Sequence, residues 1–288
     1  MKTAPELSSL ANQPGGRDGP PDFAKASSWA VPDEGPRRSL QSVGGPGRPL
    51  CSARPAVAPY LWHPSDVRAS IVAHLRKLAS PRDAEGQRRF GISPGVELLG
   101  IRAPVLREIA RAHRRDHALA LELWASGMHE ARIIAALVDE PKAVRRSQME
   151  RWVRDCDNWA VTDACCCVLF DRTPFAIEKA HAWSGRQAEF VKRAGFVLMA
   201  GLAVHRKELP DEVFLEFFPL IRREAVDERN FVKKAVNWAL RQIGKRNPRL
   251  RCAAIAEAEE IRRLDSRSAR WIAADAIREL RRAKSKLQ

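Results

Sequence analysis

The sequence predicts an all-α protein, and three observations support this prediction. From residue 65 onward apolar residues recur at helical spacing, as in the series Val67, Ile71, Leu75 and Leu78. No run alternates between apolar and polar residues for long enough to form a strand. Residues that break helices fall between the helical segments: Pro141, Pro174, Pro210 and Pro248. We therefore expect short helices joined by brief connections.

The helices also repeat along the chain. FVKRAGFVLM begins at Phe190, and the similar segment FVKKAVNWAL begins at Phe231. RWIAADAIREL at Arg270 follows KKAVNWALRQI at Lys233 by a similar interval. A period of about 40 residues, with two helices per unit, is typical of HEAT and armadillo repeats, whose units stack because none can bury its apolar face alone. The predicted fold is a HEAT-like/armadillo-type helical-repeat solenoid with one concave face.

Boundary signals support the individual helices. Ser65 and Asp66 resemble an N-cap before the first apolar series, and Pro104 suits the first turn of the helix that follows the connection FGISPGVELLGIRAP. The later helices are expected, in chain order, at DHALALELWASG, HEARIIAALVDE, SQMERWVRDC, the stretch 155–170, PFAIEKAHAWS, QAEFVKRAGFVLMAGLAVH, PDEVFLEFFPLIRREA, NFVKKAVNWALRQIGK, PRLRCAAIAEAEEIRR and SARWIAADAIRELRRA.

The N-terminal segment, residues 1–60, differs in composition from the rest of the chain. It holds 10 of the 19 prolines and 7 of the 16 glycines and shows little periodicity. Such a segment cannot bury enough apolar surface to offset the entropy lost on ordering. We therefore expect a disordered tail at residues 1–60 and one helical-repeat domain at residues 61–288.

The charge balance indicates a polyanionic partner. The chain has 50 Lys and Arg against 35 Asp and Glu, a formal net charge of +15. Nucleic acid is the first candidate for the partner and an anionic membrane surface the second. No apolar run approaches the length that a transmembrane helix needs, and the N-terminus lacks the order of a secretory signal. We expect a cytoplasmic protein, associated with the nucleoid if the source is bacterial.

The cysteines do not predict a metal site. There are six, and no CxxC pair occurs among them. Three are consecutive at 165–167, so in a helix their side chains point about 100° apart and cannot converge on one ion. Reduced and mostly buried thiols are expected, with no metal and no cofactor.

The stretch Asp155–Phe170, DCDNWAVTDACCCVLF, places Trp159 four residues before Asp163. No Pro or Gly interrupts it, so a helix is expected, and this spacing puts the two side chains on one face. A ring face and a carboxylate can each stabilise a cation. The structural alternative is a core tryptophan beside an aspartate in a salt bridge.

A second group of candidate site residues lies on the segment Asn230–Lys245. Its apolar residues form a face that is expected to be buried: Val232, Ala235, Val236, Ala239, Leu240 and Ile243. Another face carries a basic stripe with one aromatic residue: Lys234, Trp238, Arg241 and Lys245. Together with the neighbouring Lys233, and with Lys192 and Arg193 one repeat earlier, these cations could follow a phosphate backbone without reading sequence. The alternative is an ordinary solvated helix face.

Several segments together resemble a known family. GIRAPVLREIA, HEARIIAALV, NWAVTD, FVKRAG and FVKKAVNWALRQIGK are similar to the AlkD-type DNA alkylation repair family of HEAT-like repeat DNA glycosylases, over roughly residues 65–282. The resemblance implies a C-shaped stack that holds duplex DNA in a basic groove. It also implies hydrolysis of the N-glycosidic bond of cationic N3- and N7-alkylated purines, without a metal and without deep base flipping.

The same resemblance assigns roles to individual residues. Asp163 matches the family's essential carboxylate, and Trp159 and Trp238 match its paired cleft tryptophans. Arg193, with Lys192 as the adjacent alternative, matches the cleft arginine that would hold a phosphate. Asp163 would stabilise the oxocarbenium-like sugar and orient the attacking water.

The chain departs from the family pattern at two places. Phe90 stands where the family often has a cleft tyrosine, and it is either a cleft aromatic or a core residue. Ala160 stands where relatives often carry Asp. Because the family includes members with little or no glycosylase activity, a non-catalytic DNA-binding protein is an alternative, and a protein-interaction solenoid is another. A monomer bound to the backbone of duplex DNA is expected.

Overall fold

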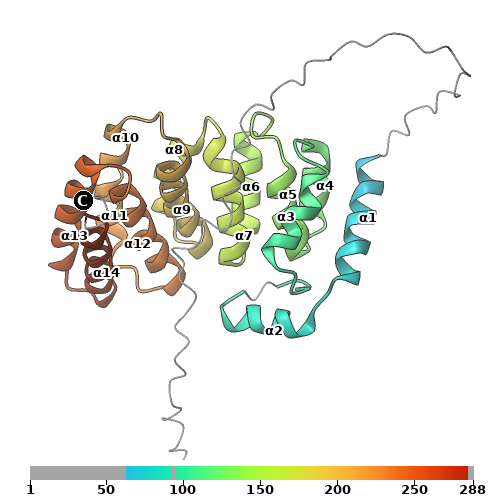
Figure 1. Cartoon of the computed structure of the whole chain (residues 1–288), viewed down its shortest axis with the longest axis horizontal. Coiled ribbons are helices and arrows are strands. Elements are labelled where there is room, and N and C mark those ends of the chain that lie inside the picture. The colour runs from blue at the N-terminus through green and yellow to red at the C-terminus, as the bar shows by residue number, and fades with distance from the viewer. Residues whose placement is uncertain (1–62, 93–94, 285–288) are drawn as a thin grey trace, which may run out of the picture.

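The computed structural model describes residues 63–92 and 95–284, and within these residues every regular element is a helix. The helices follow one another in a row from α1 to α14 (Figure 1). The all-α prediction is therefore confirmed. The predicted tail at residues 1–60 and Cys51 lie outside the described residues. None of the described helices is both long and apolar enough to span a bilayer.

The elements are short, as the boundary signals predict. In chain order they are α1 (Pro64–Lys77), α2 (Pro81–Arg89), α3 (Ala103–Arg111), α4 (His117–Ala125), α5 (His129–Val138), α6 (Arg146–Asp155), α7 (Trp159–Ala164), a π-helical turn η2 (Cys165–Leu169), a 3₁₀ turn η3 (Phe170–Arg172), α8 (Ala176–Ser184), α9 (Glu189–His205), α10 (Asp211–Leu215), α11 (Phe218–Glu224), α12 (Asn230–Gly244), α13 (Pro248–Arg262) and α14 (Arg267–Lys284).

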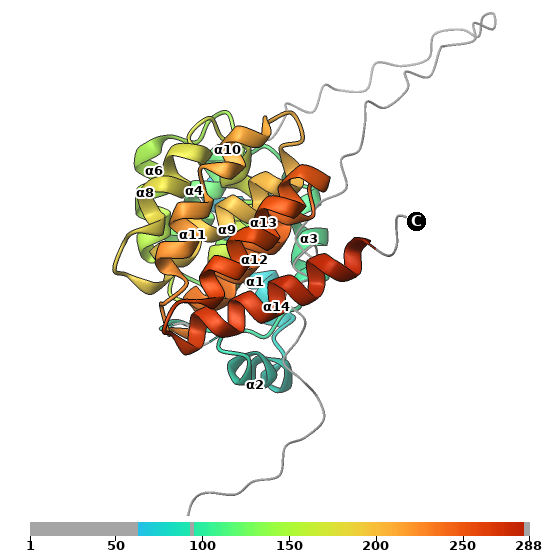
Figure 2. The same ribbon diagram turned by 90° about the vertical axis from the view of Figure 1, so that its left-hand side faces the viewer.

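The array is built of helix pairs that pack on the next pair. Helices α4 and α5, α8 and α9, and α13 and α14 contact each other within pairs, while α9 packs on α12 and α12 on α14 between pairs. Phe190 and Phe231, which begin the two repeated segments, bring their rings to 5.6 Å between centroids. The repeat that was predicted from the sequence is therefore a repeat in space, viewed end-on in Figure 2.

An aromatic series joins three successive units through the core. Trp124 of α4 stacks on Trp152 of α6 at 4.0 Å between ring centroids and an interplanar angle of 2°. Phe170 lies 6.2 Å from Trp152 and 6.1 Å from Trp183 of α8. Because large aromatic side chains contribute much of the buried apolar surface, this series holds the units in fixed register.

The first helix begins differently from the prediction. Helix α1 starts at Pro64, and the side chain of His63, rather than that of Ser65, serves as its N-cap by accepting from the backbone N–H of Ser65. Proline at the first helical position suits this start, because its missing N–H would have no partner there. Pro104 lies in the first turn of α3, as predicted.

The central stretch is not one continuous α-helix, and the prediction of a helix over 155–170 is wrong at its start, whereas residues 165–170 are helical but in π-helical and 3₁₀ form. Helix α6 ends at Asp155, and α7 begins only at Trp159. Asn158 sets this start, because its side-chain oxygen accepts from the N–H groups of Ala160 and Val161 at 3.0 and 3.2 Å. After Ala164 the backbone widens into the π-helical turn. Trp159 and Asp163 keep their one-turn separation within α7.

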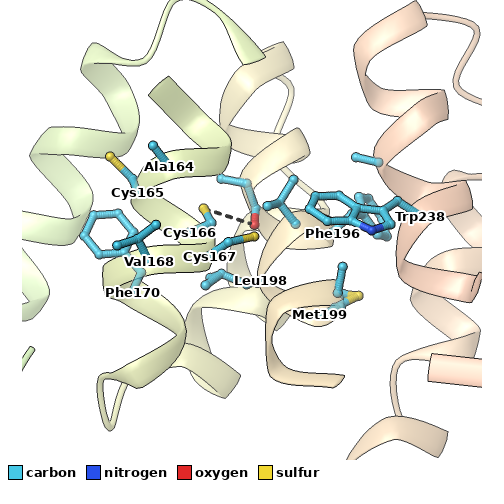
Figure 3. Close-up of a cluster of buried hydrophobic side chains, with 14 of the residues drawn as sticks. Ala164, Cys165, Cys166, Cys167, Val168, Phe170, Phe196, Leu198, Met199 and Trp238 are labelled. Carbon is cyan, nitrogen blue, oxygen red and sulfur yellow. Dashed lines mark hydrogen bonds between the residues drawn. The ribbon is translucent and has the colours of Figure 1, made fainter. Parts of the chain in front are cut away.

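The cysteines of η2 are core residues. Figure 3 shows Cys165, Cys166 and Cys167 in a buried cluster with Phe170, Phe196 and Trp238. The Cys166 thiol donates to the carbonyl of Ala194 over 3.7 Å. Burial raises the pKa of all three thiols, so they stay protonated and unreactive near neutral pH. Cys156 is buried as well, whereas Cys252 is exposed.

His129, which packs against the N-cap of α7, makes stability depend on pH. Its ring nitrogen Nδ1 lies 3.3 Å from Asn158 Nδ2, and burial lowers the pKa of His129 from 6.5 to about 4. The unfolded chain therefore binds more protons than the native protein below pH 6.5, and stability is lost as pH falls from 6.5 toward 4. Wild type should lose about 3 kcal/mol more than His129→Gln between pH 7 and pH 4 in urea titrations. Equal losses in the two proteins would contradict this prediction.

Candidate functional site

The predicted carboxylate and the predicted arginine form a buried ion pair. Arg193 Nε donates to Asp163 Oδ1 over 2.9 Å, and its Nη2 donates to Asp163 Oδ2 over 2.7 Å. Both residues are only 1% exposed. This is the bidentate geometry that a planar guanidinium and a carboxylate favour. Both residues are predicted site residues, but the family resemblance predicts that Arg193 binds a phosphate rather than Asp163.

The ion pair connects three helices. Asp163 lies on α7 and Arg193 on α9, and Arg193 Nη1 also donates to the carbonyl of Phe231 on α12 over 2.7 Å. Burial raises the pKa of Asp163, and the adjacent guanidinium opposes that change. Removing two charges from water is costly, and only close pairing offsets the cost. Arg193 therefore both orients Asp163 and favours its ionised form.

The turn after α2 brings Phe90 to Trp159 of α7, so two more predicted site residues meet. Trp159 Nε1 donates to the carbonyl of Phe90 over 3.0 Å. The next residue, Gly91, contacts the ring of Phe231. Phe90 is 50% exposed, so the alternative that it is a core residue is wrong. Contacts thus run from Trp159 through this turn to Phe231 and on to Arg193.

Gly91 is needed for this turn, and replacing it provides a test of the packing. Its φ is +80°, and a Cβ there would lie 2.5 Å from Phe231 Cζ. We expect Gly91→Ala to destabilise the protein by at least about 1–2 kcal/mol from the backbone conformation alone. The matched control is Gly86→Ala in α2, where a Cβ meets nothing within 4 Å and helix propensity favours alanine. Chemical denaturation would measure both, and equal stability of the two variants would contradict this packing.

Trp238 is more deeply buried than its predicted role suggests. It is 5% exposed and lies beside Phe196 in the core (Figure 3). Its indole Nε1 is buried and has no hydrogen-bond partner within the described part of the chain. A buried donor without a partner costs free energy and is uncommon. The predicted meeting of Trp238 with Trp159 in one cleft remains a prediction.

The basic residues of α12 do not form one continuous solvent-exposed stripe, so that expectation is wrong. Arg241 is buried and pairs with Asp275 over 3.4 Å and with Glu279, which also pairs with Lys245. One repeat earlier, buried Lys192 contacts two acids in the same way, Glu224 at 2.5 Å and Asp227 at 3.1 Å. Because these acids come from neighbouring helices and from the connection after α11, the face of a single helix could not reveal them. A role for these cations in DNA binding remains a prediction.

Lys233 and Lys234, at the start of α12, are half-buried cations, and Lys233 lies beside an exposed aromatic ring. Lys233 Nζ lies 5.4 Å from the ring centroid of Trp271, which is 42% exposed. Burial lowers the pKa of Lys234, and the nearby charges of Arg193 and Lys233 add to this effect. Sequence reasoning missed Trp271, although the repeat alignment already places it in register with Lys234.

Two groups of this site are suited to stabilise a positive charge: the carboxylate of Asp163, held in a fixed orientation, and the indole of Trp159 one turn away on α7. The two lysines at the start of α12 favour an anion instead. In the range that the structure describes, no group of three or more His, Cys, Asp and Glu side chains is placed to hold a metal ion. Electrostatic stabilisation by a preorganised group is the chemistry that these residues offer.

Comparison with known proteins identifies a family and a related fold. The model of a family described as "DNA alkylation repair enzyme" matches residues 71–280. The chain is also similar to a solved structure described as "a new family of proteins related to the HEAT-like repeat DNA glycosylases with affinity for branched DNA structures". That likeness has a TM-score of 0.60 at 19% identity and covers 73% of this chain and 94% of the other. No curated protein matches the chain.

The matched family region runs from α1 into α14 and therefore includes every residue of the candidate site. The solved structure independently supports a HEAT-like repeat fold. The chain therefore belongs to the DNA alkylation repair enzyme family.

Proposed function

We propose that the protein is a DNA glycosylase that hydrolyses the N-glycosidic bond of cationic N3- and N7-alkylated purines in duplex DNA, with Asp163 as its catalytic carboxylate. The observation that carries this proposal is the bidentate Asp163–Arg193 pair on α7 and α9. A buried carboxylate held in one orientation by a guanidinium is well suited to stabilise a developing positive charge.

The proposed chemistry needs only one carboxylate. An alkylated purine already carries a positive charge and leaves without being protonated. The sugar then acquires oxocarbenium character, which Asp163 would stabilise while orienting the attacking water. Trp159 and Trp238 would contact the sugar and the cationic base through their ring faces. Because Asp163 is 1% exposed, binding of damaged DNA must move neighbouring side chains to give the sugar access.

DNA binding is proposed to begin at the start of α12. Lys233 lies there beside the exposed ring of Trp271, with Lys234 next to it in the chain, and the net charge of +15 favours a polyanion. The affinity of the related family for branched DNA supports a DNA partner. Contacts to the phosphate backbone would not depend on base sequence.

The experiment uses duplex DNA methylated with an alkylating agent and an excess of wild-type protein. Release of 7-methylguanine or 3-methyladenine is followed by chromatography, and DNA binding is measured in the same buffer. Release above the spontaneous rate is the expected result. Binding without release would reject the glycosylase proposal.

A second candidate function is DNA binding without catalysis. The observation that favours it is that both carboxylate oxygens of Asp163 accept hydrogen bonds from Arg193, and that this pair is buried. In that case the pair would serve only to join α7 to α9. Binding without base release in the experiment above would select this candidate.

A charge-reversal variant separates both DNA functions from a protein-interaction role. Lys233→Glu combined with Lys234→Glu should weaken duplex binding and should lower the slope of log affinity against log salt by about 2 or more. The control is Arg262→Glu combined with Arg263→Glu at the end of α13, where both arginines are exposed. Unchanged DNA affinity in the α12 variant would favour the protein-interaction alternative.

A further inference from the structure

A cavity of about 640 Å³ opens at the edge of the array, between α4, the turn after α5, and α6. Helices α4 and α6, which line it, lie in the first half of the repeat array (Figure 1). The cavity shares none of the residues of the Asp163 site. Its walls include Lys142 and Arg145 from the turn and Arg151 from α6. It is therefore separate from the helices that the Asp163–Arg193 pair connects.

The three cations of this cavity differ from their neighbours in how they are paired. Lys142, Arg145 and Arg151 are exposed, and none forms an ion pair with a carboxylate in the parts of the chain described here. By contrast, Arg146 pairs with Glu178 at 2.8 Å and Arg154 with Glu150 at 3.9 Å. The cations that line the cavity are thus available to an anion from outside the protein.

A buried carboxylate, that of Asp139, fixes two polar side chains that line the cavity. Buried Asp139 accepts from Gln148 Nε2 over 2.7 Å, and its other oxygen lies 2.7 Å from His117 Nδ1. Both His117 and Gln148 line the cavity. The carboxylate of Asp139 is therefore engaged by these two groups, and burial raises its pKa. Asp139 lies beneath the lining, and the lining itself contains the three cations and no carboxylate, so its net charge is positive.

The other nearby carboxylate is also engaged. Glu140 pairs with Arg115 at 3.7 Å and accepts from the backbone N–H of Lys142 at 3.3 Å. No side chain caps the start of α6 at Arg145, where the helix dipole adds positive potential. The cavity is thus a positively charged hollow with a fixed polar floor, and Ser147 adds a hydroxyl to its wall.

We propose that this cavity binds a phosphate group. Two guanidinium groups and an ammonium around one hollow match the charge and the several acceptor oxygens of a phosphate, and guanidinium forks favour bidentate contacts with it. The hollow is large enough to hold a phosphate that is part of a larger molecule. The DNA backbone is one source of such a phosphate, and a free phosphate ester is the other. With DNA as the source, the cavity holds a segment apart from the one at Asp163.

The test compares two variants that remove the same charge. Arg145→Gln combined with Arg151→Gln removes two cavity cations, and Arg262→Gln combined with Arg263→Gln removes two that pair with Glu259 and Glu260 on α13. One arm measures affinity for duplex DNA across a salt series. The other arm measures the thermal midpoint of each protein with and without inorganic phosphate.

The two arms distinguish the sources of the phosphate. If DNA supplies it, the cavity variant should lose at least about tenfold in affinity and about 2 in salt slope, while the α13 variant changes less. If a free ester supplies it, inorganic phosphate should raise the midpoint of wild type and of the α13 variant but not that of the cavity variant. Identical behaviour of the two variants in both arms would overturn the proposal. Base release is not measured, so this outcome is independent of the glycosylase proposal.

Discussion

Replacing Arg193 with methionine is expected to destabilise the protein by about 3–5 kcal/mol, because it leaves the Asp163 carboxylate buried without a counter-charge. The side chain of Arg193 bonds both oxygens of Asp163 and the carbonyl of Phe231, and neither member of the pair is exposed to solvent. Chemical denaturation of the folded variant at neutral pH would measure the loss.

A solvent-exposed pair provides the control for this prediction. Arg146 bonds Glu178 at 2.8 Å, but the two side chains are 61% and 47% exposed. Arg146→Met should therefore cost no more than about 1 kcal/mol. The double variant Arg193→Met with Asp163→Leu should recover much of the stability lost in the single variant, because an apolar pair can replace a buried ion pair. An equally small loss for Arg193→Met would contradict the structural account of the pair.

Replacing Asp163 with asparagine is expected to slow base release by about 10²–10³-fold under single-turnover conditions. This is the usual effect of removing one group that stabilises charge in a transition state. The substitution also leaves Arg193 buried without a counter-charge, so lost stability could be mistaken for lost catalysis. The thermal midpoint and the DNA affinity of the variant must therefore be measured beside its rate.

A second buried aspartate provides the control for catalysis. Asp171 is fully buried and bonds His205. Asp171→Asn should lower stability without a specific effect on base release at temperatures where the variant is folded. Equal slowing by the two variants would indicate that excision responds to stability rather than to the Asp163 carboxylate.

The helices and their repeat could be predicted because they depend on local pattern. The apolar face of α12 and the two segments that begin at Phe190 and Phe231 are visible from spacing alone, and the structure places them as expected. The break before α7 was missed, although Asn158 followed by an apolar run is an N-cap signal. The π-helical turn that follows has no such signal in the sequence.

The surroundings of the site could not be predicted, because they depend on contacts between units. Arg193 was identified from its place in the repeat, but its bond to Asp163 crosses from α9 to α7. The sequence predicts Lys192 as one of a row of exposed cations. In the structure Lys192 is instead paired with Glu224 and Asp227. The spacing along one helix determines which residues share a face, but the residues that pack against that face come from other parts of the chain.

The most direct measurement compares wild type and Asp163→Asn side by side on duplex DNA that contains 7-methylguanine, at protein concentrations that give equal DNA occupancy. The account predicts release of the base by wild type and release slower by about 10²–10³-fold by the variant. Equal rates for the two folded proteins, or bound DNA that keeps its methylated base, would contradict it.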